Sequence, residues 1–301
     1  MTAATTVSIR EVGLRDGLQL EDPVPTDDKL ALLAAIAATG VRRIELTAFV
    51  SPRAVPAMAD AEELAARARE VVPESVELSA LVAGPGGARR AVAAGITTVE
   101  YVISAADGHS RANVRASTDE AVARTEEVAG IVHGAGGQVE AIIATAFDCP
   151  FDGPTDPDRV VAVAGRALEL GADTLAVADT IGTAVPGRVL DLVSRIRSAL
   201  APARLGAHFH DTRGAGLACA WAAAAAGVTD LDASVGGLGG CPFAPGATGN
   251  IATEELVYLL EDSGVATGMD LSATLTAAAE TARIVGHPVP SGLLRAGDRK
   301  R

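Results

Sequence analysis

The segment Gly40-Val41-Arg42-Arg43-Ile44-Glu45 joins the end of a helical pattern directly to the start of a strand pattern. A glycine that ends a helix lets the chain turn at once into the following strand. Three further segments share this outline, namely Gly95-Ile96-Thr97-Thr98-Val99-Glu100, Gly171-Ala172-Asp173-Thr174-Leu175 and Gly227-Val228-Thr229-Asp230-Leu231-Asp232. The repeat predicts recurring helix-to-strand units, with coincidence among Ala- and Gly-rich turns as the alternative.

Strand and helix patterns alternate along the rest of the chain. The strand candidates are Val7–Glu11, Arg43–Thr47, Val76–Leu81, Thr98–Ile103, Val139–Thr145, Thr174–Ala178, Arg204–His208 and Asp230–Ala233. Helical periodicity is found between them, for example in Asp27–Thr39, Asp60–Val72, Thr118–Gly134 and Pro157–Leu170. The repeated segments precede the second, fourth, sixth and eighth strands. This order predicts an α/β fold, a (β/α)8 TIM barrel. A doubly wound open sheet is the competing fold, but no Gly-x-Gly-x-x-Gly follows the first strand.

The sequence predicts one catalytic domain. The barrel spans about residues 7–262 and ends with a Gly-rich loop, Ser234 to Gly249, and a helix from about Ile251 to Asp262. A C-terminal helical extension covers about residues 263–294 and contains a helix at Leu271 to Val285. We expect this extension to pack on the barrel or on another subunit.

Composition limits the partners and the compartment. The 301 residues are 49% hydrophobic and 21% charged, with a net charge of −13, and no long basic run is present. This balance argues against binding to nucleic acid or to an anionic membrane surface. Three cysteines without a framework spacing favour reduced thiols in the cytoplasm. The sequence has no signal-like N-terminal segment and no apolar run of membrane-spanning length, so we expect a cytoplasmic protein without membrane contact.

A pair of histidines lies at the end of the seventh strand candidate, in Ala207-His208-Phe209-His210-Asp211-Thr212. Alternate residues of a strand share a face, so His208 and His210 point the same way. Two neighbouring imidazoles can ligate one divalent metal ion. The alternative is a pair of hydrogen-bonded histidines beside a loop.

Other polar residues follow the strands at the end of the barrel where such folds place their chemistry. Arg15 and Asp16 follow the first strand, and a plain turn pair is the alternative for them. Glu45 interrupts an apolar strand, and an inward-facing carboxylate needs a partner, for which Arg15 is the available cation. Asp179 ends the sixth strand and could simply cap the next turn.

Two cysteines have contrasting surroundings. Cys241 follows Gly236-Gly237-Leu238-Gly239-Gly240, and such a glycine-rich loop could carry the thiol over a site. A small residue in a tight turn is the alternative. Cys219, in Ala218-Cys219-Ala220-Trp221, is interpreted as a buried and inert thiol.

Several of these segments together resemble the hydroxymethylglutaryl-CoA lyases of the wider DRE-TIM metallolyase group. The resemblance runs from about Val7 to Gly268. It is carried by Glu11-Val12-Gly13-Leu14-Arg15-Asp16-Gly17-Leu18-Gln19, Ile44-Glu45-Leu46-Thr47, Phe49-Val50-Ser51-Pro52, Asp179-Thr180-Ile181-Gly182, His208-Phe209-His210-Asp211-Thr212, Gly237-Leu238-Gly239-Gly240-Cys241-Pro242 and Gly249-Asn250-Ile251-Ala252-Thr253-Glu254.

The resemblance implies a metal-dependent barrel lyase that cleaves 3-hydroxy-3-methylglutaryl-CoA to acetoacetate and acetyl-CoA, a step of leucine degradation. It implies an acyl-CoA substrate and a homodimer. The implied metal ligands are Asp16, His208, His210 and Asn250. The resemblance places Arg15 and Glu45 at the catalytic centre and Cys241 on a mobile loop. An oxygen and imidazole ligand set suits Mg²⁺ or Mn²⁺, and either His208 or Asp16 takes the substrate's hydroxyl proton.

The sequence departs from the family pattern at several positions. Leu14 stands where Pro is common, Leu20 where Asn is frequent, Ala48 where Ser is common and Ala54 where Trp is frequent. The segment Ala105-Ala106-Asp107-Gly108-His109-Ser110 is also unusual. Several of these positions should border the acyl or CoA pocket, so a different 3-hydroxyacyl-CoA is an alternative substrate. A condensing relative that uses acetyl-CoA and a 2-oxo acid is a second competing hypothesis, and a non-catalytic barrel is a third.

Overall fold

Eight parallel strands form a closed barrel in a computed structural model that describes residues 6–240 and 249–299. Around the barrel their order is β1-β10-β9-β8-β5-β4-β3-β2. Their bounds are β1 Ser8–Glu11, β2 Arg43–Phe49, β3 Glu77–Val82, β4 Thr98–Ser104, β5 Gln138–Ala144, β8 Thr174–Asp179, β9 Leu205–Phe209 and β10 Asp230–Ala233. The (β/α)8 barrel predicted from the sequence is therefore confirmed, and the open doubly wound sheet is excluded.

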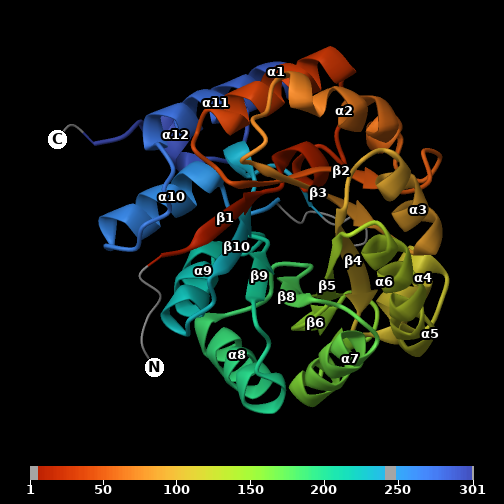
Figure 1. The fold of residues 1–301 in the computed structure, drawn as a ribbon. Helices are drawn as coiled ribbons and strands as arrows, with labels where there is room; N and C mark the ends of the chain where they lie inside the picture. Colours follow the sequence, from red (N-terminus) through yellow and green to blue (C-terminus); the bar gives the residue numbers. More distant parts are fainter. Residues whose placement is uncertain (1–5, 241–248, 300–301) are drawn as a thin grey trace.

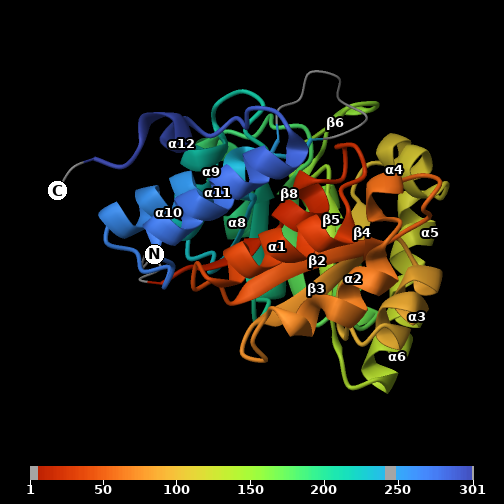
Figure 2. The same ribbon diagram turned by 90° about the horizontal axis from the view of Figure 1, so that it is seen from above.

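Helices surround the strands as an outer ring (Figure 1). Their bounds are α1 Thr26–Ala37, α2 Ala61–Arg67, α3 Pro85–Ala93, α4 Asp107–Val114, α5 Thr118–Ala123, α6 Thr125–Gly134, α7 Pro157–Glu169, α8 Pro186–Leu200, α9 Gly216–Ala225, α10 Thr253–Asp262, α11 Leu271–Val285 and α12 Gly292–Ala296. The expected C-terminal helix agrees with α11 at both ends. It packs on the barrel against α1, as Figure 2 shows.

The four glycines of the repeated segment explain how the chain enters alternate strands. Gly40, Gly95, Gly171 and Gly227 have φ values of 87°, 85°, 104° and 87° and precede β2, β4, β8 and β10. These values lie in the left-handed region, where a residue without a Cβ is favoured. The prediction that each glycine ends a helix and starts a strand is confirmed.

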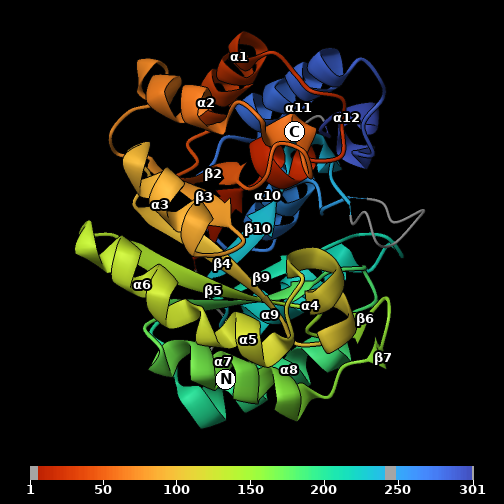
Figure 3. The ribbon, with the colours of Figure 1, turned by 90° about the vertical axis from the view of Figure 1, so that its right-hand side faces the viewer.

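Three local features differ from the sequence analysis. The segment Thr118–Gly134 forms two helices, α5 and α6, which meet at Arg124. The unusual segment after β4 forms the short helix α4, and a hairpin of β6 Asp148–Cys149 and β7 Gly153–Pro154 follows β5. Figure 3 shows α4 and the hairpin on the same side of the barrel, and the Gly108 N–H donates to Asp152 at 2.7 Å. Both features lie at the end of the barrel where the strands end.

The interior of the barrel contains an ionic layer. The guanidinium of Arg10 on β1 donates to Glu100 on β4 at 2.7 Å, to Glu140 on β5, and to Asp232 on β10 at 2.9 Å. The side chain of Arg10 is 2% exposed. Branched aliphatic side chains usually fill this space in barrels of this kind. In this chain the ionic groups connect the walls beneath the mouth of the barrel.

None of the helices within residues 6–240 and 249–299 combines the length and the apolar character that crossing a lipid bilayer requires.

Candidate active site

Arg15 and Asp16 are positioned by one turn of π-helix, Gly13–Gly17, directly after β1. π-Helical turns are rare and occur frequently at functional sites. Both side chains are buried, and the Nη1 of Arg15 lies 3.2 Å from the Oδ2 of Asp16. The sequence analysis placed this pair after the first strand, with a plain turn as the alternative. The structure gives the pair a π-helical backbone, and both side chains are buried.

His208 on β9 and His210 just after it lie beside Asp16. The two rings are 5.0 Å apart between centroids. The Nε2 atoms of His208 and His210 lie 3.4 Å and 3.8 Å from the Oδ2 of Asp16. All three residues are buried, and one ligand atom from each lies within 4.8 Å of the others. The structure therefore brings Asp16, His208 and His210 together as a candidate metal site.

The electrostatic surroundings keep Asp16 ionised. Burial alone would raise the pKa of this carboxyl, but the Arg15 guanidinium and the two imidazoles outweigh burial and hold its pKa well below its usual value. An ionised carboxylate is the form that binds a cation.

Glu45 holds Arg15 in place. The Nε of Arg15 donates to the Oε2 of Glu45 at 2.7 Å, and the Glu45 residue is fully buried. The register between β2 and β3 shifts between Glu45 and Thr47, and such irregularities redirect side chains near active sites. Burial opposes the charge on Arg15, but Glu45 and Asp16 more than compensate and raise its pKa. The ion pair predicted from the sequence is confirmed.

Asn250 lies in the segment between β10 and α10. Its backbone pairs with His210 in an isolated bridge, and its Nδ2 donates to the carbonyl of Leu238 at 2.9 Å. Gly239 separates it from Asp16, because a Cβ on Gly239 would lie 2.4 Å from Asn250 Nδ2 and 3.0 Å from Asp16 Oδ1. Asn250 is thus a neighbour of both His210 and Asp16.

Buried polar atoms without a hydrogen-bond partner test whether these residues fit a metal ion. Among the described residues, such atoms include Asp16 Oδ1, His210 Nε2 and Asn250 Oδ1. Leaving a buried polar group unpaired is costly unless a ligand or water satisfies it. A carboxylate, imidazoles and an amide oxygen suit a divalent cation that prefers oxygen and nitrogen ligands. The residues fit such an ion.

Two buried acids near the site were missed by the sequence analysis. The Oε1 of Glu11 accepts the N–H groups of Gly13 and Val235 at 2.8 and 2.9 Å, and its Oε2 accepts the Thr253 hydroxyl at 2.5 Å. Asp232 accepts from Nδ1 of His208 at 3.1 Å. The signal was available, since both acids lie within predicted strands, as Glu45 does.

The remaining candidates have different outcomes. Cys241 lies outside the described residues. Asp179 accepts the N–H groups of Thr183 and Ala184, each at 2.9 Å, as expected of a residue that caps a turn. Cys219 is buried, and burial raises the pKa of its thiol to about 12, so it is inert as expected.

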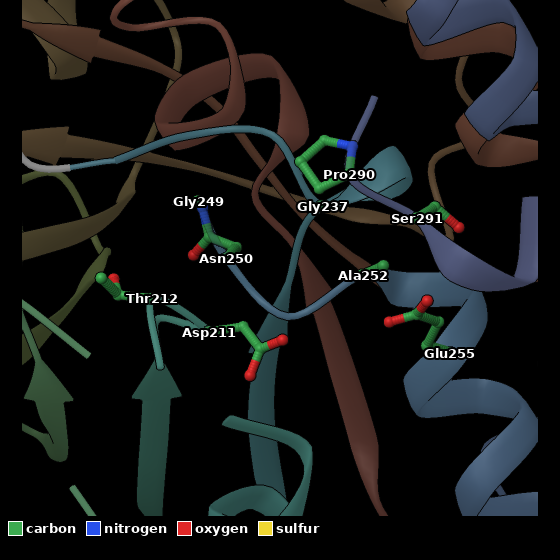
Figure 4. Close-up of a pocket in the computed structure, with 9 residues that line it drawn as sticks. All are labelled: Asp211, Thr212, Gly237, Gly249, Asn250, Ala252, Glu255, Pro290 and Ser291. Atoms are coloured by element: carbon green, nitrogen blue, oxygen red, sulfur yellow. The ribbon is translucent and has the colours of Figure 1, made fainter. Parts of the chain in front are cut away.

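A cavity of about 210 Å³ adjoins the candidate site, and Asn250 is part of its lining. Figure 4 shows its other walls, with Asp211 and Thr212 directly after β9 and Glu255 on α10. Asn250 therefore lies between the candidate metal ligands and this cavity at the mouth of the barrel.

Comparison with known proteins gives matches over nearly the whole chain. The HMGL-like family model matches residues 6–281. The (R)-citramalyl-CoA lyase of Chloroflexus aurantiacus is 39% identical, covering 97% of this chain and 95% of that protein. The hydroxymethylglutaryl-CoA lyase of Pseudomonas mevalonii is 41% identical, with 89% and 88% covered. A solved HMG-CoA lyase from Acinetobacter baumannii, in complex with coenzyme A and 3-methylmalate, has a TM-score of 0.93 at 38% identity and covers 100% of this chain and 98% of its own.

Proposed function

Because the chain belongs to the HMGL-like family, we propose that it is a divalent-metal-dependent lyase that cleaves 3-hydroxy-3-methylglutaryl-CoA to acetoacetate and acetyl-CoA. The observation that carries the proposal is the convergence of Asp16, His208 and His210 at the mouth of the barrel. Relatives named as hydroxymethylglutaryl-CoA lyases support the substrate. The cation is Mg²⁺ or Mn²⁺, as the oxygen-containing ligand set favours.

Asp16, His208, His210 and Asn250 would hold the cation. The unpaired Oδ1 atoms of Asp16 and Asn250 and the Nε2 of His210 supply lone pairs for it. The chemistry that such an ion supplies when bound is positive charge, which lowers the pKa of a neighbouring hydroxyl group.

Cleavage requires the tertiary hydroxyl of the substrate to lose its proton. We propose Asp16 or His208 as the acceptor of this proton, since both side chains lie at the site, with the Nε2 of His208 3.4 Å from the Oδ2 of Asp16. The carbon–carbon bond next to the alkoxide then breaks. Its electron pair passes to the thioester fragment as an enolate, and the former alcohol carbon becomes the ketone of acetoacetate. Addition of one proton to the enolate carbon completes acetyl-CoA.

Arg15 is positioned to stabilise the enolate. Glu45 fixes the guanidinium through Nε, which leaves N–H groups on the other nitrogens for the developing oxyanion. Removing one such donor typically lowers the rate by about 10²–10³. From the family resemblance, Cys241 is the group that supplies or relays the proton to the enolate carbon.

(R)-Citramalyl-CoA is a second candidate substrate, because a relative that covers 97% of this chain carries that name. Its acyl group is one methylene shorter, and the same type of bond breaks to give pyruvate and acetyl-CoA. One methylene changes discrimination by roughly 10–200-fold. The two substrates can therefore be ranked by kcat/KM.

The test is a direct assay of the purified protein with Mn²⁺ or Mg²⁺ and each thioester. We expect acetoacetate and acetyl-CoA from 3-hydroxy-3-methylglutaryl-CoA, and loss of turnover in EDTA that added Mn²⁺ restores. A higher kcat/KM for citramalyl-CoA would replace the named substrate and keep the lyase class. The lyase proposal would be overturned if the protein condensed acetyl-CoA with a 2-oxo acid and cleaved the acyl chain of neither 3-hydroxy-3-methylglutaryl-CoA nor citramalyl-CoA.

The family resemblance further supports a cytoplasmic homodimer that acts in leucine degradation. Light scattering on the purified protein measures the subunit number, and a monomer that retains full activity would contradict the dimer. Growth of a deletion strain on leucine tests the pathway.

A further inference from the structure

The two ring nitrogens of His208 face different partners. Its Nε2 lies 3.4 Å from Asp16 in the candidate metal site, whereas its Nδ1 lies 3.1 Å from the Oδ2 of Asp232. Both His208 and Asp232 are buried. His210 differs, because its Nδ1 has no hydrogen-bond partner among the described residues. The two candidate ligands are therefore supported unequally.

Arg10 fixes the carboxylate of Asp232. Its Nε and Nη2 donate to the Oδ1 and Oδ2 of Asp232, each at 2.9 Å, in a bidentate pair. Its Nη1 is itself held by Glu100 and Glu140 on the opposite wall of the barrel. A planar guanidinium held at both ends prevents the carboxylate from rotating away from His208.

This arrangement determines which nitrogen of His208 carries the proton. The bidentate pair with the Arg10 guanidinium occupies both oxygens of Asp232 with N–H donors, so Asp232 is a carboxylate that only accepts hydrogen bonds. The Nδ1 of a neutral His208 must then be the N–H donor. The lone pair lies on Nε2, on the side of Asp16.

We propose that Asp232, anchored by Arg10, is the positioning residue that sets the tautomer and ring orientation of His208 for metal binding. The proposal rests on the proposed metal-dependent function. Carboxylates that accept the second N–H of a ligating histidine typically contribute about 10–100-fold to metal affinity. Asp232 does not touch the substrate in this proposal and acts only through His208.

The first test is a spectroscopic measurement on the metal-free protein. In a long-range ¹H–¹⁵N spectrum of ¹⁵N-histidine-labelled protein, assigned with a His208→Gln variant, we expect His208 to be protonated at Nδ1. Asp232→Ala should shift His208 toward the Nε2-protonated form or a mixture. Nε2 protonation of His208 in the unsubstituted protein would overturn the proposal, whether or not the Asp232→Ala variant folds.

The second test uses Mn²⁺ alone and a matched control. Asp232→Ala should raise the Kd for Mn²⁺ about 10–100-fold. Glu140→Ala is the control, because Glu140 also contacts Arg10 but does not touch His208. It should leave the tautomer unchanged and the Kd near that of the unsubstituted protein. Asn is avoided at 232, since its amide oxygen could still accept from Nδ1.

The outcomes separate this proposal from the lyase assignment. Equal loss of Mn²⁺ affinity in both variants, or no loss in Asp232→Ala, would reduce Asp232 to a structural role. Thermal unfolding of both variants checks that they are folded when they are compared. The protein could fail to break the carbon–carbon bond of either acyl-CoA and still bind Mn²⁺ with His208 in the expected tautomer. In that case the lyase proposal fails and this one stands.

Discussion

Asp16 combines more roles than any other described side chain of the site. It contacts Arg15 and lies near both imidazoles, and its Oδ1 is a buried atom without a partner. An amide at this position would keep the shape but lose the charge. The identity of this one acid therefore decides whether the cluster attracts a cation.

We expect Asp16→Asn to weaken Mn²⁺ binding by more than the roughly 10–100-fold that loss of a ligand's supporting partner costs. Asp211→Asn is the matched control. The Asp211 carboxylate lies nearby, where it accepts the Gly216 N–H, and this substitution removes the same charge as Asp16→Asn. Titration calorimetry measures both. Equal weakening in the two variants would indicate a general effect of charge instead of ligation by Asp16.

His109 should make stability depend on pH. It is buried with its Nδ1 2.6 Å from the Ser104 hydroxyl, and burial lowers its pKa from 6.5 to about 4. Below pH 6.5, His109 takes up a proton in the unfolded chain but not in the folded protein. The contribution of His109 to the free energy of unfolding is therefore complete above pH 6.5 and is lost as the pH falls toward 4.

Between pH 7 and pH 4.5, the unsubstituted protein should lose about 2 kcal/mol more unfolding free energy than His109→Asn loses. Urea unfolding at the two pH values measures this difference, and other titrating groups cancel in the comparison. Parallel pH dependence in the two proteins would show that His109 is not held in its neutral form by the fold.

At the scale of elements, the segment after β10 determines how closely Asn250 approaches Asp16. Gly239 has a φ of 120°, and a side chain there would overlap the Asn250 amide. The backbone conformation and the close approach both require glycine. The backbone of Gly239 therefore helps to set the distance between the side chains of Asn250 and Asp16.

Gly239→Ala should raise the Kd for Mn²⁺ about 10-fold, since backbone strain of this kind costs about 1–3 kcal/mol. Gly86→Ala, in the first turn of α3, is the control, because a Cβ at that position meets nothing within 4 Å. Mn²⁺ titration and thermal unfolding of both proteins test this. Unchanged affinity in Gly239→Ala would show that the loop can move without disturbing the ligands.

The short helix α4 shows why some elements could not be predicted. Its sequence, Asp107-Gly108-His109-Ser110-Arg111-Ala112-Asn113-Val114, contains glycine, serine and asparagine, which are weak helix formers. Tertiary hydrogen bonds compensate, because Asp152 accepts the Gly108 N–H and Asp107 accepts the Thr118 N–H. The prediction of one continuous helix over Thr118–Gly134 was wrong because the helical periodicity of the sequence continues across Arg124, where α5 ends and α6 begins.

At the scale of the whole molecule, metal binding and folding should be linked. The candidate ligands come from the ends of β1 and β9 and from the segment before α10, so an ion at the site would connect distant parts of the barrel. An ion that binds the folded state alone stabilises it by mass action.

Free Mn²⁺ at 100 times its Kd should raise the unfolding free energy by about 2.7 kcal/mol. Thermal unfolding in EDTA and in Mn²⁺ measures this gain, and Asp16→Asn should remove most of it. An equal gain in the variant would place the stabilising ion at another site.

Local sequence was sufficient to predict the alternation of strands and helices, the glycines that enter four strands, and the shared face of His208 and His210. These features depend on residues a few positions apart, whose relation is fixed by backbone geometry. The pairing of Arg10 with Asp232, which supports His208, could be identified only in the folded chain. Arg10 and Asp232 are separated by 222 positions, and barrel closure alone places them in contact. Local periodicity shows that a charge faces inward, but its partner depends on strand order and register across the closed sheet.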